Sequence, residues 1–320
     1  MQSDKAGTLG MTQADSMEQV LPHYGGRTGA GTGSSPEQWQ ETGKWFSYGD
    51  HAIFSRMAGD GEALVLVHGF PTASWDYSRL WPLLNQQQYR LLAMDMLGFG
   101  FSDKPVNYAY SIQDQADLHE GWIEGLRLKN VHLLAHDYGC SVVQELLARE
   151  QEGLLRFRIT SVCFLNGALF PEVHRPMMIQ RLLSSPIGGL VSRGLTRKVF
   201  DTNFCRLFGD DRHPSVAELD SFWQLLTYNN GRGILHRLIH YMEERRCHRN
   251  RWVNALQNAR QPMRLISGTA DPVSGIAMAM RYRELVPNAD VISLRGVGHY
   301  PHYESPAEVY RAFRDFQRRS

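Results

Sequence analysis

The sequence predicts an α/β fold, in which a doubly wound, mostly parallel sheet carries an inserted helical cap. Six short apolar runs alternate with helical patterns, at residues 63–68, 90–95, 131–136, 159–166, 263–268 and 291–296. Such alternation is typical of strands joined by helical crossovers. Between residue 168 and about residue 258 the strand signal is missing, and the apolar residues follow helical spacing instead.

These patterns divide the 320-residue chain into three parts. Residues 1–38 are rich in Gly, Ser, Thr and Gln, so we expect a disordered tail, with Met11 and Met17 as alternative starts. The α/β core is expected at 39–167 and 259–320, and the helical cap at 168–258. A hydrophobic content of 42% is enough for one large domain with such an insertion.

Composition narrows the class of protein. A net charge of +1 argues against nucleic acid or an anionic surface as the main partner. The four cysteines are scattered without metal-ligand spacing, which favours reduced thiols and a cytoplasmic location. No apolar stretch is long enough to span a membrane, and no cofactor is implied. The oligomeric state stays open.

The most informative residue is Asp137, between the strand 131–135 and a helix that starts near Ser141. A strand, a sharp turn and a helix form a nucleophile elbow, which needs small residues near the nucleophile. Ala135 and Gly139 supply them. Taken alone, an aspartate at this position could also be a helix N-cap.

Other segments complete a catalytic pattern. A strand runs into the turn 68–71, where the backbone N–H of Phe70, together with that of Tyr138, would form an oxyanion hole. Asp271 follows another strand, and His299 follows the last one. The order of nucleophile, acid and base along the chain fits an elbow hydrolase.

In this arrangement, residues 42–318 resemble the α/β-hydrolase superfamily, in its aspartate-nucleophile branch of epoxide hydrolases and haloalkane dehalogenases. The runs 95–105 and 170–176 and the pair Asp137-Tyr138 are more particularly similar to the mesoderm-specific transcript proteins of vertebrates.

The resemblance implies a two-step reaction on a small apolar organic substrate. The carboxylate of Asp137 would attack a saturated carbon to give an alkyl ester. His299, oriented by Asp271, would then activate water to hydrolyse that ester, with the oxyanion held by the N–H groups of Phe70 and Tyr138.

Three of the histidines in the segments that form this site differ in their expected roles. The resemblance places the base at His299, so His302 is interpreted as a packing or surface residue. His136 should point away from the pocket, because neighbours at a strand end face opposite sides. The acid is assigned to Asp271, because Asn166 and Gly167 offer no carboxylate after the preceding strand.

The leaving group decides between epoxides and halides. Epoxide hydrolases use cap tyrosines, and Tyr241 resembles one of them, although it could be a core tyrosine. His174 is a possible substitute for the other, or a hinge residue of the cap. Dehalogenases keep tryptophan after the nucleophile, where this chain has Tyr138. The basic run 245–251 is interpreted as a solvated helix face, with a site for acidic substrates as the alternative.

The sequence therefore predicts an epoxide hydrolase that opens epoxides to diols through Asp137, Asp271 and His299. The alternatives are a haloalkane or haloacid dehalogenase with the same triad, and a non-enzymatic binding protein on this fold. Substrate size and enantiopreference stay open.

Overall fold

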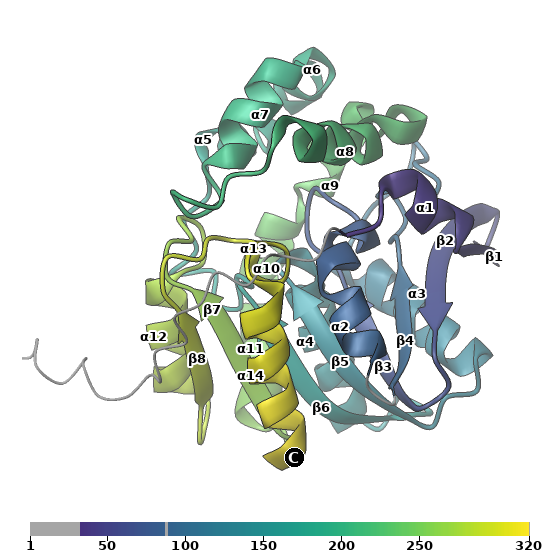
Figure 1. The fold of residues 1–320 in the computed structure, drawn as a ribbon, viewed down its shortest axis with the longest axis vertical. Helices are drawn as coiled ribbons and strands as arrows, with labels where there is room; N and C mark the ends of the chain where they lie inside the picture. Colours follow the sequence, from purple (N-terminus) through teal and green to yellow (C-terminus); the bar gives the residue numbers. More distant parts are fainter. Residues whose placement is uncertain (1–32, 87–88, 320) are drawn as a thin grey trace, which may run out of the picture.

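The computed structural model describes residues 33–86 and 89–319, which form an eight-stranded sheet between two layers of helices, with further helices above one end (Figure 1). The strand order is β1-β2-β4-β3-β5-β6-β7-β8. The strands are β1 Lys44–Tyr48, β2 His51–Ala58, β3 Glu62–Val67, β4 Tyr89–Met94, β5 Asn130–His136, β6 Arg158–Leu165, β7 Met263–Gly268 and β8 Asp290–Leu294.

The predicted fold class is confirmed, and the six predicted strands are β3 to β8. All pairs among them are parallel. Two strands at the edge, β1 and β2, were not predicted. They form an antiparallel hairpin on β4, and β1 is largely exposed, so it lacks the apolar run that identifies the buried strands.

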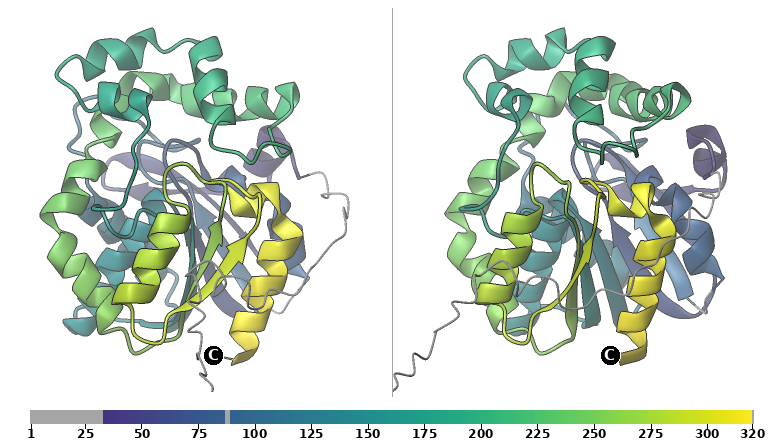
Figure 2. Two further views of the ribbon diagram at one scale, coloured as in Figure 1. Left: turned by 90° about the vertical axis from the view of Figure 1, so that its left-hand side faces the viewer. Right: turned by 60° about the vertical axis from the view of Figure 1, so that its left-hand side comes forward.

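Helices cover both faces of the sheet (Figure 2). One face carries α2 Trp81–Asn85 and α14 Pro306–Arg319. The other carries α3 Ile112–Gly125, α4 Tyr138–Gln151, α11 Arg249–Gln257 and α12 Ile276–Leu285. Shorter elements lie at the loops: η2 Ser74–Arg79 and α13 Pro301–Glu304.

A set of helices lies over the carboxyl ends of the parallel strands (Figure 1). They are α5 Met178–Leu183, α6 Gly188–Gly194, α7 Arg197–Cys205, α8 Val216–Thr227, η3 Tyr228–Ile234 and α9 Leu235–Leu238. The chain then returns to the core through α10 Tyr241–Cys247. The cap was predicted to span residues 168–258. Within that range, however, α11 packs against α4 of the core, where the indole N–H of Trp252 donates to Glu145 over 2.8 Å.

The last part of the predicted tail forms a helix. Residues 1–32, with Met11 and Met17, lie outside the described residues, but α1 Pro36–Glu41 occupies part of the predicted tail. Ser35 and Gln38 form a capping box, and Pro36 takes the first turn. Trp39 is fully buried and its indole N–H donates to Ser74 over 3.1 Å, so this short helix is held by the core.

Among the described residues, no helix is long and apolar enough to cross a membrane.

The parallel strands have their carboxyl ends at the same edge of the sheet, below the cap. In parallel α/β sheets this edge is where ligands bind, and the loops after β3, β5, β7 and β8 meet there.

Candidate active site

Asp137 occupies a strained turn between β5 and α4. Its backbone has φ 41° and ψ −105°, and its side chain is 3% exposed. The turn brings α4 close to β3: a Cβ at Gly139 would lie 2.5 Å from the carbonyl oxygen of Val67, so this position needs glycine. Although Asp137 stands at the N-cap of α4, its carboxylate caps no helical N–H, and the N-cap interpretation fails.

Both oxygens of the Asp137 carboxylate have donors from outside its own helix. The N–H of Phe70 donates to Oδ2 over 3.1 Å, and Arg245 Nη2 lies 3.4 Å from Oδ1. Burial would raise the pKa of Asp137, but the positive charges of Arg245 and His299 outweigh burial and hold the pKa below its usual range. The carboxylate is therefore ionised and oriented.

The interpretation of the basic run as a solvated face is wrong for Arg245, which is 1% exposed. Arg245 Nη2 donates to the backbone oxygen of Asp137 over 3.0 Å, and Nε donates to the Ser141 hydroxyl over 2.7 Å. The guanidinium lies over the ring of Tyr241, at 4.5 Å. The spacing of four residues from Tyr241 was the available signal, because it places Arg245 on the same buried face of α10.

The other basic residues of this run lie nearer the surface. Arg246 pairs with Glu243, Arg249 with Glu172, and Arg251 with Glu152 and Glu145. Arg245 alone among these arginines reaches the elbow, because α10 turns it inward while its neighbours on the helix face outward.

His299 and Asp271 form a second buried pair beside the elbow. His299 Nδ1 lies 2.9 Å from Asp271 Oδ2. Burial disfavours a charged imidazole, but the carboxylates of Asp271 and Asp137 raise the pKa of His299 to about 9. In turn, despite burial, His299 and hydrogen bonds lower the pKa of Asp271 to about 2. The resting pair is therefore an imidazolium and a carboxylate.

Sequence reasoning missed the residues that orient Asp271. The Asn166 side-chain amide and the Ser274 hydroxyl each donate to Oδ2 over 2.7 Å, and the Val273 N–H donates to Oδ1. Asn166 is itself held, because its oxygen accepts from the Gly268 N–H. In the sequence, Asn166 was noted only because it is not the catalytic acid. The structure shows that its amide orients the carboxylate of Asp271 instead.

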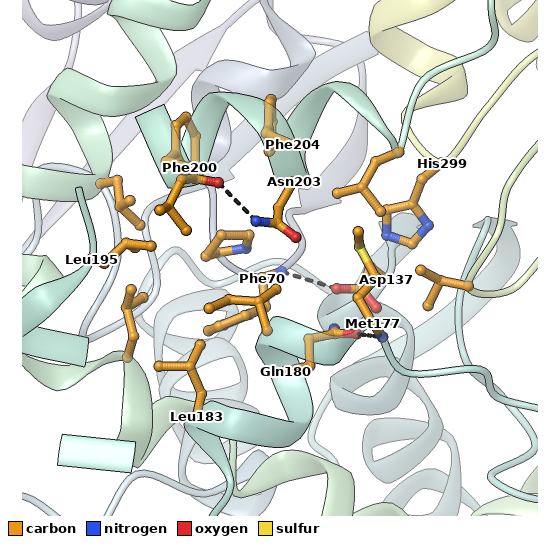
Figure 3. Close-up of a pocket in the computed structure, with 17 residues that line it drawn as sticks. Phe70, Asp137, Met177, Gln180, Leu183, Leu195, Phe200, Asn203, Phe204 and His299 are labelled. Atoms are coloured by element: carbon orange, nitrogen blue, oxygen red, sulfur yellow. Dashed lines mark hydrogen bonds between the residues drawn. The ribbon is translucent and has the colours of Figure 1, made fainter. Parts of the chain in front are cut away.

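Asp137 and His299 face a pocket between the strand ends and the cap (Figure 3). Gln180 from α5 and Asn203 from α7 contribute amides to a wall that is otherwise apolar. The apolar lining comprises Phe70, Pro71, Met177, Ile179, Leu183, Leu195, Val199, Phe200, Phe204, Leu207, Leu226, Leu235 and Val273. Such a pocket suits a small apolar molecule.

The predicted leaving-group residues lie behind this wall. Tyr138 and Tyr241 are each 1% exposed, and their rings pack against each other with centroids 5.1 Å apart. The Tyr241 hydroxyl accepts from the Gln180 amide over 3.3 Å, so Gln180 stands between it and the pocket. His174 is also outside the lining, and burial and Arg245 lower its pKa to about 4.

The two other histidines considered in the sequence, His136 and His302, are buried outside the pocket lining. His302 is fully buried rather than at the surface. His136 Nε2 lies 2.8 Å from the backbone oxygen of His299, away from the pocket. With Asp76 they form, within 33–86 and 89–319, the one group whose donor atoms lie close enough for a metal ion, all within 4.8 Å. Burial raises the pKa of Asp76 well above its usual value, and its carboxyl group accepts from the Thr72 hydroxyl rather than from these imidazoles.

The Asp271–His299 pair predicts how stability depends on pH. A pKa raised to about 9 from 6.5 adds stability that is complete below pH 6.5 and lost as pH rises to 9. We expect the free energy of unfolding, measured with denaturant, to fall by about 3 kcal/mol over this window. H299Q should remove this fall, and H240Q, at an exposed histidine, should keep it. An unchanged slope in H299Q would contradict the assignment.

The buried Arg245–Asp137 pair predicts non-additive effects of substitution. R245M leaves a buried carboxylate without its cation, and we expect a loss of about 3 kcal/mol in the free energy of unfolding. D137N/R245M removes both charges and should be more stable than R245M. R246M, at an exposed arginine of the same helix, is the control and should change little. Losses that simply add in the double variant would show that the two groups do not interact.

Comparisons with known proteins identify the family of this chain. Residues 64–312 match the Alpha/beta hydrolase family. The human Mesoderm-specific transcript homolog protein is 39% identical over 291 residues, 87% of this chain and 86% of that protein. A haloalkane dehalogenase of Mycobacterium marinum is 34% identical over 149 residues, 44% of this chain and 48% of the other.

Among solved structures, haloalkane dehalogenase DbeA from Bradyrhizobium elkani has a TM-score of 0.74 at 19% identity, and covers 87% of this chain and 99% of that chain. This likeness concerns the fold. The family match over most of the chain and the similarity to the human Mesoderm-specific transcript homolog protein confirm the resemblance seen in the sequence. The chain belongs to the α/β-hydrolase family.

Proposed function

We propose that this α/β hydrolase opens small apolar epoxides to diols through an alkyl ester on Asp137. The observation that carries the proposal is an ionised carboxylate, in place of a hydroxyl, at the elbow, facing an apolar pocket beside His299. A carboxylate needs no base to become a nucleophile, and its alkyl ester can be hydrolysed by water at the carbonyl carbon.

In the first step, Asp137 Oδ1 attacks a ring carbon while Oδ2 stays on the Phe70 N–H. The carbon–oxygen bond of the epoxide breaks and the leaving oxygen takes a proton. Arg245 favours an ionised Asp137 at neutral pH, at the expense of some nucleophilicity, because it lies 3.4 Å from Oδ1. The apolar lining excludes water that would compete for the carboxylate.

The second step uses a change in the charge of the site. Alkylation removes the negative charge of Asp137, which is one of the charges that raise the pKa of His299. The pKa of His299 therefore falls in the ester, and the imidazolium releases its Nε2 proton, which balances the proton taken up by the leaving oxygen in the first step. The neutral Nε2 can then accept a proton from the attacking water. Asp271 holds the ring through Nδ1, and the oxyanion forms next to the N–H groups of Phe70 and Tyr138.

Tyr241 is the proposed proton donor to the leaving oxygen. Its hydroxyl accepts from Gln180, which leaves its own proton free, and its ring packs on Phe70, at 5.5 Å between centroids. Burial raises the pKa of Tyr241, so the hydroxyl is protonated at neutral pH. A change of the Gln180 rotamer would open the hydroxyl to the pocket. His174 has an unpartnered buried Nε2 and stays a secondary candidate.

A second candidate function, dehalogenation of haloalkanes, is favoured by the amides of the pocket. A halide leaves as a stable anion and needs N–H donors rather than a proton. Gln180 and Asn203 bring such donors to the lining, and Gln180 keeps one N–H beyond its bond to Tyr241. Relatives that match part of the chain carry the name haloalkane dehalogenase. The triad would act in the same way.

Trapping the ester tests the shared chemistry and identifies the substrate class. H299Q should form the alkyl ester but hydrolyse it slowly, because the water then lacks its base. Intact-protein mass spectrometry after incubation with styrene oxide should show the full mass of the epoxide added. With a chloroalkane, the gain would instead equal the substrate less hydrogen chloride.

D137A/H299Q is the control for this trap and should show no adduct. An adduct of equal yield in that variant would place the modification on another residue. No adduct from any epoxide or haloalkane in H299Q would end the proposal of an ester on Asp137.

The leaving-group donors can be separated by two substitutions on the same hydrogen bond. Y241F removes the hydroxyl while keeping the ring, and should lower kcat for epoxides by on the order of 10²-fold. Q180L removes the amide, and should leave epoxide opening within a fewfold of the wild type. For a chloroalkane we expect the reverse ranking of the two variants. Equal activity of Y241F and wild type on epoxides would remove Tyr241 from the site.

A further inference from the structure

The outer face of the cap exposes large apolar side chains. Met178 and Leu182 lie one turn apart on α5, with exposed fractions of 67% and 39%. Ile187 and Leu190, at the start of α6, are 54% and 71% exposed. The two helices contact each other at the top of the molecule, away from the sheet (Figure 1). We call these four residues the cap patch.

The cap patch is accompanied by positive charge without acidic residues. Residues 173–200 contain five Lys and Arg residues and no Asp or Glu. Arg175, Arg181, Arg193 and Lys198 are exposed, and none forms an ion pair with a carboxylate of the described chain. The fifth, Arg197, pairs with Asp201 and Asp220.

The carboxylates that flank this segment are already neutralised. Glu172 lies between Arg249 and Arg281, at 2.6 Å and 3.1 Å. Asp201 and Asp220 share Arg197. The charges of the four exposed cations are therefore not compensated by nearby carboxylates and are available to an anionic partner. A typical surface, by contrast, intersperses both signs.

The helix α5 connects the cap patch with the pocket. Ile179, Gln180 and Leu183 on its inner side line the pocket, while Met178 and Leu182 face outward. A surface helix normally keeps one face polar. Here both faces carry apolar side chains, so one thin wall separates an apolar pocket from an exposed apolar surface.

We propose that the cap patch, with the surrounding arginines, docks onto a lipid bilayer that carries anionic headgroups. Apolar side chains among basic residues, without acidic ones, are the chemistry that suits this interface: the side chains insert at the acyl boundary while guanidinium groups meet phosphates. The docked cap would place the pocket next to the membrane, where apolar molecules concentrate. The docking itself does not depend on the reaction proposed above.

Two other occupants fit the surface less well. A second copy of this chain would bring the same unpaired arginines face to face across a symmetric contact, which is repulsive. A protein partner would need an acidic rim around an apolar centre. A bilayer with anionic headgroups supplies both the negative charge and the apolar interior. It needs no specific shape in the protein, and the cap patch consists only of single side chains from two short helices.

Vesicle binding by the full chain tests the proposal. We expect sedimentation with vesicles of phosphatidylcholine and about 30% phosphatidylglycerol to exceed that with phosphatidylcholine alone by about tenfold at low salt. L182S/I187S/L190S should lower this binding about tenfold. R181S/R193S should lower it severalfold and weaken its dependence on salt.

The matched control is I276S/M280S/R283S, which removes two exposed apolar residues and an exposed arginine from α12, in the layer beside the sheet. It should bind vesicles within about twofold of the wild type, and circular dichroism should show all variants folded. Equal binding to neutral and anionic vesicles, or an equal loss in the control, would overturn the proposal. A dimeric mass by light scattering that L182S/I187S/L190S makes monomeric would assign the patch to a second copy.

Discussion

The structure around the site depends on keeping one negative charge, on Asp137, in a place where water cannot solvate it. An isolated carboxylate in such a position would take up a proton rather than stay charged. The chain answers with a guanidinium from α10, a backbone N–H from the turn after β3, and an imidazolium after β8. Each comes from a different part of the sequence, so the charge of Asp137 can be stable in this buried position only once the whole fold has formed.

The charges of the site balance in the resting state. Two carboxylates, Asp137 and Asp271, are matched by Arg245 and by the protonated His299. Because the four groups are buried together, a change on one alters the proton affinity of the next. In the proposed two-step reaction, this coupling would keep His299 charged until Asp137 has reacted and would make it a base only afterwards.

The sequence predicted the parts of this site that local rules govern. The six parallel strands carry short apolar runs. The elbow and the two loops that carry Asp271 and His299 follow strand ends, where ligands bind in parallel α/β sheets. It failed where burial depends on long-range packing. Arg245 looks like its exposed neighbours until the direction of α10 is known. The capping box at Ser35 was readable, but the composition of the preceding residues concealed it.

The contact of Arg245 with the elbow also limits how the molecule can open. The arginine belongs to the segment that returns from the cap, yet its guanidinium is bonded to the backbone of the core at Asp137. If residues 168–258 moved away from the core as one body, Arg245 would leave the site and the buried carboxylate of Asp137 would lose its cation. The helices before α10 can move without breaking this contact, whereas α10 cannot.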